Sequence, residues 1–189
     1  MSNGPGQAGG SPDSLASLPP QTHEYTTASA EATRALGAAL AVCIQPGQVI
    51  ALRGDLGAGK TTFVQGLAAG LGFAGQVTSP TFILVNEYLL PGCRRLVHID
   101  AYRLGDAGAV ALDEAATFGL EELLVAEDAI VAIEWSERVA DALPDDYLLV
   151  ELQATDLDVR RIRISAIGAQ SASALARLRA AYFVSPRNT

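Results

Sequence analysis

The sequence predicts an α/β fold in which a mixed, mostly parallel sheet is flanked by helices. Two observations lead to this fold class. A glycine-rich stretch at residues 54–61 stands between an apolar segment, 48–53, and a segment with apolar residues at helical spacing, 61–71. An uninterrupted apolar run at residues 129–133 suits a central strand that is covered on both faces. The chain is therefore expected to alternate strands and helices around one sheet.

A hairpin after the helix at 61–71 makes the expected sheet mixed. Apolar segments at 83–89 and 95–102 are separated by a short turn at Pro91 and Gly92, which favours antiparallel pairing. Upstream, residues 29–41 predict an amphipathic helix that Ser29 can cap. The remaining expected elements are an acidic helical stretch at 106–128, strands at 147–152 and 160–167, and a final helix at 171–182.

Composition predicts one globular domain. A chain of 189 residues with 49% hydrophobic and 18% charged residues can bury a sizeable core. We expect a disordered tail rich in Gly, Pro and Ser at residues 1–22, a single domain at 23–184 and a loose end at 185–189. No apolar run approaches the roughly 20 residues of a membrane span, and the first residues lack the pattern of a secretory signal.

Charge and cysteine content narrow the function classes. The net charge of −8 and the pI of about 4.7 weigh against a broad electrostatic grip on nucleic acid. Cys43 and Cys93 form neither a disulfide framework nor a metal cluster by their spacing, so a cytoplasmic location is expected.

The glycine-rich stretch matches the phosphate-binding pattern G-x-x-x-x-G-K-[ST] at every fixed position, and it therefore predicts a P-loop NTPase fold. Lys60 is the one lysine of the chain, and the other twelve basic residues are arginines. Backbone N–H groups of such a loop surround phosphates at the start of a helix. Lys60 is expected to reach the β- and γ-phosphates, Thr61 to bind Mg²⁺, and Thr62 to face the α-phosphate.

Two acids could complete the site. Asp100 and Glu134 each end an apolar strand, and P-loop enzymes hold Mg²⁺ with a carboxylate from a neighbouring strand. The pattern leaves open which acid binds the metal and which orients water. It also leaves open that either acid is only a solvated strand end. Lys60, Asp100 and Glu134 are the expected catalytic residues.

Several neighbouring side chains have two interpretations. Thr78, Ser79 and Thr81 could sense the γ-phosphate as a switch segment, or they could cap an ordinary turn. His98 is more often a packed histidine than a ligand. Trp135, the sole tryptophan, could belong to the core or lie near the ligand at the carboxyl end of its strand.

Five segments together resemble one family in order and spacing. They are residues 54–62, 78–82, 98–104, 119–123 and 133–137, and the resemblance covers about residues 25–165. The family is TsaE, also called YjeE, the ATPase subunit of bacterial tRNA threonylcarbamoyladenosine biosynthesis.

The resemblance implies a weak ATPase that uses ATP and Mg²⁺ and is stimulated by its partners. These would be a TsaD-like threonylcarbamoyl transferase, which modifies adenosine 37 of tRNAs reading ANN codons, and a TsaB-like inactive paralogue; tRNA would be contacted only indirectly. Thr61 and Glu134 would bind the metal, with Asp100 nearby and Thr78, Ser79 and Thr81 as the switch-like segment. The nucleotide would contact Gly57, Ala58, Gly59, Lys60, Thr61, Thr62 and Trp135.

Two other functions remain open. A small-molecule P-loop kinase usually has an arginine-rich lid, whereas residues 105–128 are acidic and contain no arginine. A nucleotide-dependent binding module would use ATP only to set a conformation, so it would not need hydrolysis.

Overall fold

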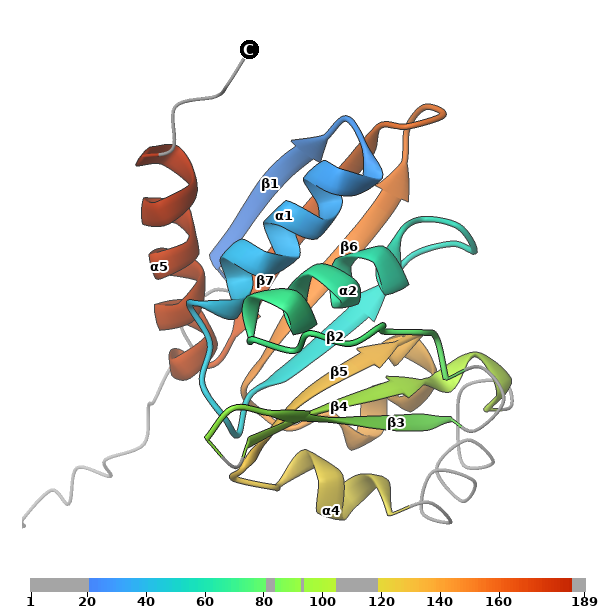
Figure 1. Cartoon of the computed structure of the whole chain (residues 1–189), viewed down its shortest axis with the longest axis vertical. Coiled ribbons are helices and arrows are strands. Elements are labelled where there is room, and N and C mark those ends of the chain that lie inside the picture. Colours follow the sequence, from blue (N-terminus) through green and yellow to red (C-terminus); the bar gives the residue numbers. More distant parts are fainter. Residues whose placement is uncertain (1–20, 81–83, 93, 105–118, 185–189) are drawn as a thin grey trace, which may run out of the picture.

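The structure is a computed structural model that describes residues 21–80, 84–92, 94–104 and 119–184 (Figure 1). Several expectations fall outside these ranges. They are most of the tail at 1–22, the loose end at 185–189, the thiol of Cys93, the hydroxyl of Thr81 and most of the helical stretch at 106–128.

One sheet of seven strands runs through the molecule in the order β1-β7-β6-β2-β5-β4-β3. Its strands are β1 (Gln21–Thr27), β2 (Val49–Arg53), β3 (Val85–Leu90), β4 (Arg94–Asp100), β5 (Ala129–Glu134), β6 (Tyr147–Ala154) and β7 (Arg160–Ile167). The four central strands, β6, β2, β5 and β4, are parallel neighbours. The β1–β7, β6–β7 and β3–β4 pairs are antiparallel.

This topology confirms the mixed sheet and the hairpin after the loop helix. The expectation of a mostly parallel sheet holds only for the four central strands, because three of the six neighbouring pairs in the described sheet are antiparallel. Strand β1 was not predicted from the sequence. Only Tyr25 and Thr27 of this edge strand are buried, so its apolar signal is weak, and its place is set by pairing with β7.

Helices cover both faces of the central strands (Figure 1). They are α1 (Ala30–Ala41), α2 (Lys60–Gly70), α4 (Leu120–Leu124) and α5 (Ala169–Val184), with 3₁₀ helices η1 (Ala101–Arg103) and η2 (Ser136–Ala142). Side chains of α1, α2 and α5 share one core with Ile130 and Ala132 of β5. Side chains of η1, α4 and η2 share a second core with Val131 and Ile133. The expectation that 129–133 is covered on both faces is therefore confirmed.

Helices α1 and α2 lie side by side at close range (Figure 1). A Cβ added to Gly66 of α2 would lie 1.9 Å from the backbone oxygen of Arg34 in α1. The Ser29 hydroxyl accepts a hydrogen bond from Ala32 N at the start of α1, as the sequence predicted for a capping residue. The close contact between α1 and α2 fixes the position of α2, the helix that begins at the end of the glycine-rich loop.

Within the described ranges, no helix is long and apolar enough to cross a membrane.

Candidate nucleotide-binding site

The glycine-rich loop joins the carboxyl end of β2 to the first turn of α2. Gly59 precedes the helix with a φ of 104°, which is a left-handed conformation that favours glycine. At the other end of the loop, a Cβ on Gly54 would lie 2.2 Å from the backbone oxygen of Leu152. Glycine is therefore required at both positions by backbone geometry. Because β2 is parallel to β5, and β5 to β4, the loop after β2 lies at the edge of the sheet where β4 and β5 also end.

Lys60 folds back onto the loop. Its Nζ donates hydrogen bonds to the backbone oxygens of Gly54 (2.6 Å) and Asp55 (3.0 Å), and it lies 3.7 Å from the centroid of the Trp135 ring. The residue is 4% exposed. Burial lowers the pKa of the ammonium, and the carboxylates of Glu134, Glu137, Asp100 and Asp55 oppose this shift. A cation is thus held where the phosphates of a nucleotide are expected.

Glu134, at the end of β5, is bound to the loop helix. Its Oε1 accepts a hydrogen bond from the Thr61 hydroxyl at 2.8 Å. The same oxygen lies 2.8 Å from Nε2 of His98. The carboxylate is nearly fully buried, with 3% of the residue exposed. The structure therefore brings together Thr61 and Glu134, the two residues that the family resemblance implied as metal ligands.

Asp100 lies directly beside Glu134, because the two residues are register partners in β4 and β5. Its Oδ2 accepts a hydrogen bond from the Ser79 hydroxyl at 2.6 Å, and its Oδ1 accepts one from the backbone N–H of Tyr102 at 3.0 Å. Thr78, in contrast, is exposed, and its backbone groups bond to the Tyr88 hydroxyl and the Asn86 amide. Of the described hydroxyls in the switch-like segment, Ser79 is the one that reaches the acids.

These residues surround a cavity of about 370 Å³. Its lining is Leu56, Gly57, Gly59, Lys60, Thr61, Thr62, Ser79, Asp100, Tyr102, Glu134 and Trp135. Trp135 has a left-handed backbone with φ of 59°, and its ring packs against Tyr102 with the centroids 5.0 Å apart and the planes tilted by 48°. Ala58 is buried in the loop and does not line this cavity. Tyr102 was not predicted as a cavity residue, although it lies in the segment 98–104 that carried the family resemblance.

A smaller hollow of about 90 Å³ adjoins this cavity across the loop. It is lined by Ala30, Thr33, Gly57, Gly59, Thr62, Asp158 and Arg160. Both hollows share Gly57, Gly59 and Thr62, so a chain of phosphates on the loop would connect them. Arg160 is held at the β6–β7 turn by hydrogen bonds to the backbone oxygens of Asp156, Leu157 and Val159. Sequence reasoning missed this hollow, because Asp158 and Arg160 approach the loop only through tertiary folding.

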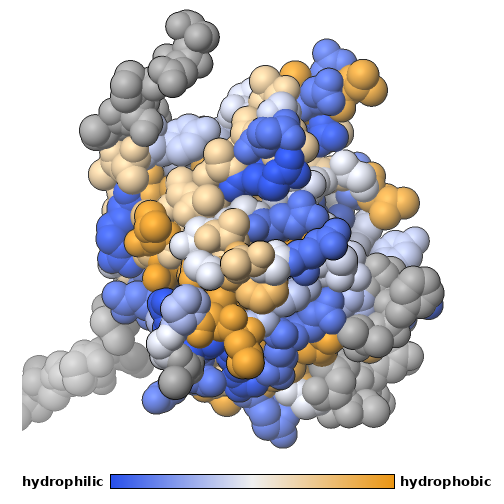
Figure 2. All heavy atoms as spheres, viewed as in Figure 1, coloured by the Kyte–Doolittle hydropathy of each residue, from blue (hydrophilic) through white to orange (hydrophobic). Residues whose placement is uncertain are grey.

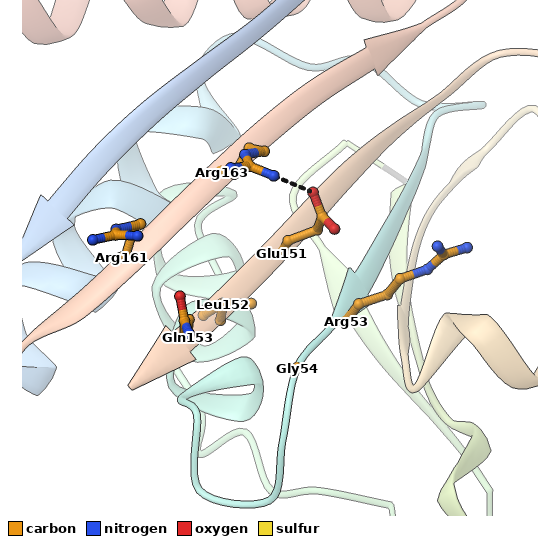
Figure 3. A pocket seen from close by; sticks show the side chains of 7 residues that line it. All are labelled: Arg53, Gly54, Glu151, Leu152, Gln153, Arg161 and Arg163. Atoms are coloured by element: carbon orange, nitrogen blue, oxygen red, sulfur yellow. Dashed lines mark ion pairs between the residues drawn. The ribbon is translucent and has the colours of Figure 1, made fainter. Parts of the chain in front are cut away.

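A third hollow, of about 250 Å³, has a different character (Figure 3). It lies on the face of β6 and β7 that points away from α1, α2 and α5. In one row across the strands, Arg53, Glu151, Arg163 and Glu24 are successive register partners of alternating charge. Arg163 bonds to Glu24 at 2.8 Å and lies 3.9 Å from Glu151. Charges of alternating sign on neighbouring strands are typical of a solvated face of a sheet.

The face of the molecule that carries α1 and α2 is mixed in polarity. Figure 2 shows hydrophilic and hydrophobic residues interspersed over the face that carries α1 and α2. Among the described residues, no group of three or more His, Cys, Asp or Glu side chains is arranged to hold a metal ion. Two acids and a threonine hydroxyl beside a phosphate loop are instead the donor set expected for Mg²⁺ that also binds phosphate oxygens.

Comparison with known proteins assigns the family. The family described as "Threonylcarbamoyl adenosine biosynthesis protein TsaE" matches residues 27–162, which include the loop, Asp100, Glu134 and Trp135. The chain belongs to the TsaE family. The resemblance inferred from the five sequence segments is thereby confirmed, and the matched range lies close to the expected 25–165.

Individual TsaE relatives agree with this assignment. The chain is 36% identical over 145 residues to the tRNA threonylcarbamoyladenosine biosynthesis protein TsaE of Bacillus subtilis, covering 77% of this chain and 86% of the relative. It is 43% identical over 139 residues to the TsaE protein of a Nostoc species, covering 73% and 82%. A crystal structure of Bacillus subtilis YdiB superposes with a TM-score of 0.73 at 30% identity, covering 88% of this chain and 99% of YdiB.

Proposed function

We propose that this chain binds Mg·ATP on the loop at 54–61 and hydrolyses it in support of tRNA threonylcarbamoyladenosine biosynthesis. The observation that carries the proposal is the hydrogen bond from Thr61 to Glu134 beside Lys60. A loop threonine and a carboxylate at the end of a neighbouring strand are the pair that holds Mg²⁺ in P-loop NTPases. The family model and the relatives named above support the biological setting.

In the bound state, the phosphates would lie over the backbone of 57–62. Lys60 would exchange its bonds to the backbone oxygens of Gly54 and Asp55 for bonds to the β- and γ-phosphates. The nucleoside would leave the loop on the side of Thr62, where the smaller hollow offers Asp158 and Arg160 as polar partners. The terminal phosphate would then point to Asp100 and Glu134.

The two acids have separate tasks in this proposal. Glu134 and Thr61 would hold Mg²⁺, and the bound ion would supply positive charge that neutralises charge developing on the phosphate oxygens. Asp100 would orient the attacking water, and hydrogen bonds from the Ser79 hydroxyl and the N–H of Tyr102 hold its carboxylate in place for this task. Ser79 is the hydroxyl through which the segment at 78–81 would sense the terminal phosphate. Trp135 and Tyr102 form the apolar wall beside this region.

The proposed partners are a TsaD-like threonylcarbamoyl transferase and its TsaB-like inactive paralogue, in the cytoplasm. The TsaE relatives are described as tRNA threonylcarbamoyladenosine biosynthesis proteins, and this process requires a transferase. The chain would act on the transferase complex rather than transfer the group itself. Its net charge of −8 favours indirect contact with tRNA, since like charges repel the phosphate backbone.

The test is ATP hydrolysis by the purified protein, alone and with the two partners and tRNA. We expect slow hydrolysis that the partners stimulate and that Glu134→Gln lowers by about 100-fold or more, a loss of about 3 kcal/mol of transition-state stabilisation. Nucleotide binding should remain. Glu87→Gln is the matched control, since Glu87 is an exposed acid paired with Arg95 on the edge hairpin.

Other outcomes would redirect the assignment. Phosphate transfer to a metabolite, without stimulation by the partners, would identify a kinase. Cells that carry Glu134→Gln and still modify their tRNA normally would identify a binding module that does not need hydrolysis. Undiminished hydrolysis in Glu134→Gln would contradict the assigned role of this acid.

A further inference from the structure

His98 is a buried histidine next to the proposed metal ligand. It is fully buried in β4 and lies on the neighbouring strand to Glu134. Its Nε2 is 2.8 Å from Glu134 Oε1. Its Nδ1 is shielded from solvent and has no hydrogen-bond partner within the described part of the chain. The ring therefore makes one strong polar contact, and that contact is with the carboxylate.

The partners of the ring determine which nitrogen carries the hydrogen. In the carboxylate form that would bind Mg²⁺, Glu134 only accepts hydrogen bonds, so we take Nε2 as the donor. An unpartnered N–H at Nδ1 would be a costly buried donor, whereas a lone pair there is tolerated more easily. The neutral Nε2–H tautomer fits both conditions. His98 then acts as a fixed donor aimed at one oxygen of Glu134.

Two donors converge on that oxygen. Thr61 Oγ1 and His98 Nε2 both lie 2.8 Å from Glu134 Oε1. In the described part of the chain, no hydrogen bond reaches the other oxygen, Oε2, although Glu134 lines the cavity of about 370 Å³. Thr61 is itself an expected metal ligand, so its bond to Glu134 depends on what the cavity contains. The bond from His98 comes from the protein core, so it does not depend on what the cavity contains.

We propose that His98 is a positioning residue that fixes the carboxylate of Glu134, so that Oε2 faces the cavity and is ready to bind Mg²⁺. This inference rests on the proposed Mg·ATP function. Residues that hydrogen-bond a metal ligand from behind commonly change metal affinity or activity by about 10–100-fold when they are removed. The competing explanation is that His98 only satisfies a buried carboxylate, in which case its loss would lower stability alone.

The test compares three variants. His98→Leu removes the donor and keeps an apolar side chain of similar size. His98→Gln places an amide nitrogen at the same number of bonds from Cα as Nε2, so it should restore the donor. His23→Gln is the control, because His23 is the other histidine of the chain and lies on the edge strand β1, away from the cavity.

The first readout is the Mg²⁺ concentration that half-saturates binding of a non-hydrolysable ATP analogue, measured by calorimetry. We expect His98→Leu to raise it by about 10-fold or more and His98→Gln to restore most of the loss. In hydrolysis assays, kcat should fall by about 10–100-fold while KM for ATP changes little. Thermal unfolding shows whether each variant is folded. A folded His98→Leu protein with wild-type Mg²⁺ dependence, or a His98→Gln protein no better than His98→Leu, would overturn the proposal.

A second readout does not depend on nucleotide. Nitrogen-15 NMR of the histidine ring should show hydrogen on Nε2 and none on Nδ1, with a shift of the Nε2 signal in Glu134→Gln. An Nδ1–H tautomer, or a ring signal indifferent to Glu134→Gln, would overturn the proposal. If the wild type fails to hydrolyse ATP while its Mg²⁺ titration and ring signals behave as expected, the proposed ATPase function fails and the positioning role stands.

Discussion

Lys60→Met removes the ammonium from the phosphate loop and keeps an apolar side chain of similar length against Trp135. In the ligand-free protein, the change loses two hydrogen bonds but also relieves the burial of a charge. These effects oppose each other, so we expect the free energy of unfolding to change by no more than about 1 kcal/mol. In the complex with Mg·ATP, the change has a larger effect, because it weakens the binding of the nucleotide. Two charge-assisted bonds to phosphate, at about 1.5 kcal/mol each, correspond to about 100-fold weaker binding.

Thermal unfolding with a non-hydrolysable Mg·ATP analogue measures this loss. At a ligand concentration of about 100 times the wild-type Kd, binding stabilises the wild type by about 2.7 kcal/mol and the variant by about 0.4 kcal/mol. The Tm of a domain of this size changes by about 2–4 °C for each kcal/mol of added stability. We therefore expect the ligand to raise Tm by about 5–10 °C in the wild type and by about 1–2 °C in Lys60→Met.

The control for this experiment is Arg94→Met. Arg94 is a cation at the opposite end of β4 from Asp100, and it bonds only to the Pro91 backbone oxygen within the described residues. It should respond to the ligand as the wild type does. An equal rise of Tm in Lys60→Met and the wild type would refute the placement of the phosphates on this loop.

Two further predictions concern aromatic residues. Trp135 is the sole tryptophan and lies 3.7 Å from the Lys60 ammonium, so Mg·ATP binding that draws Lys60 away should change its fluorescence; an emission spectrum unchanged at saturation would contradict this movement. Burial raises the pKa of Tyr25 to about 12, with a smaller contribution from Tyr182, so the wild type should lose stability as the pH rises from 10 toward 12. Measured by urea unfolding, the wild type should lose about 1 kcal/mol of stability at pH 11, and Tyr25→Phe should lack this loss. The same dependence of unfolding free energy on pH in both proteins would contradict the role of Tyr25.

The loop and its flanking elements were readable from the sequence because their signals are local. The fixed positions of 54–61, the strand before it and the helix after it depend on residues within about two dozen positions of each other. The glycines confirm why the pattern is strict, since Gly59 has a left-handed φ and Gly54 approaches the Leu152 backbone. The acids at 100 and 134 were found in the same way, as polar residues that end apolar strands.

The edge strand β1 was harder to predict than the edge strand β3, since its position is set by a pairing partner far away in the chain. Strand β1 has few buried residues, and its partner β7 lies more than 130 positions away in the chain. The balance of parallel and antiparallel pairs likewise depended on where β1 and β7 join the sheet. Strands that pair over such distances leave little trace in local periodicity.

The sequence by itself determined the glycine-rich loop, its single lysine and the two strand-end acids, because each is a local pattern of residue types. Only the tertiary structure decided how these residues meet. Parallel pairing of β4 and β5 placed Asp100 beside Glu134, and it brought Nε2 of His98 to 2.8 Å from Glu134 Oε1. The fold also brought Arg160 to the loop across the β6–β7 turn. Such contacts join atoms that are far apart in the chain, and their geometry is fixed by sheet register and side-chain packing.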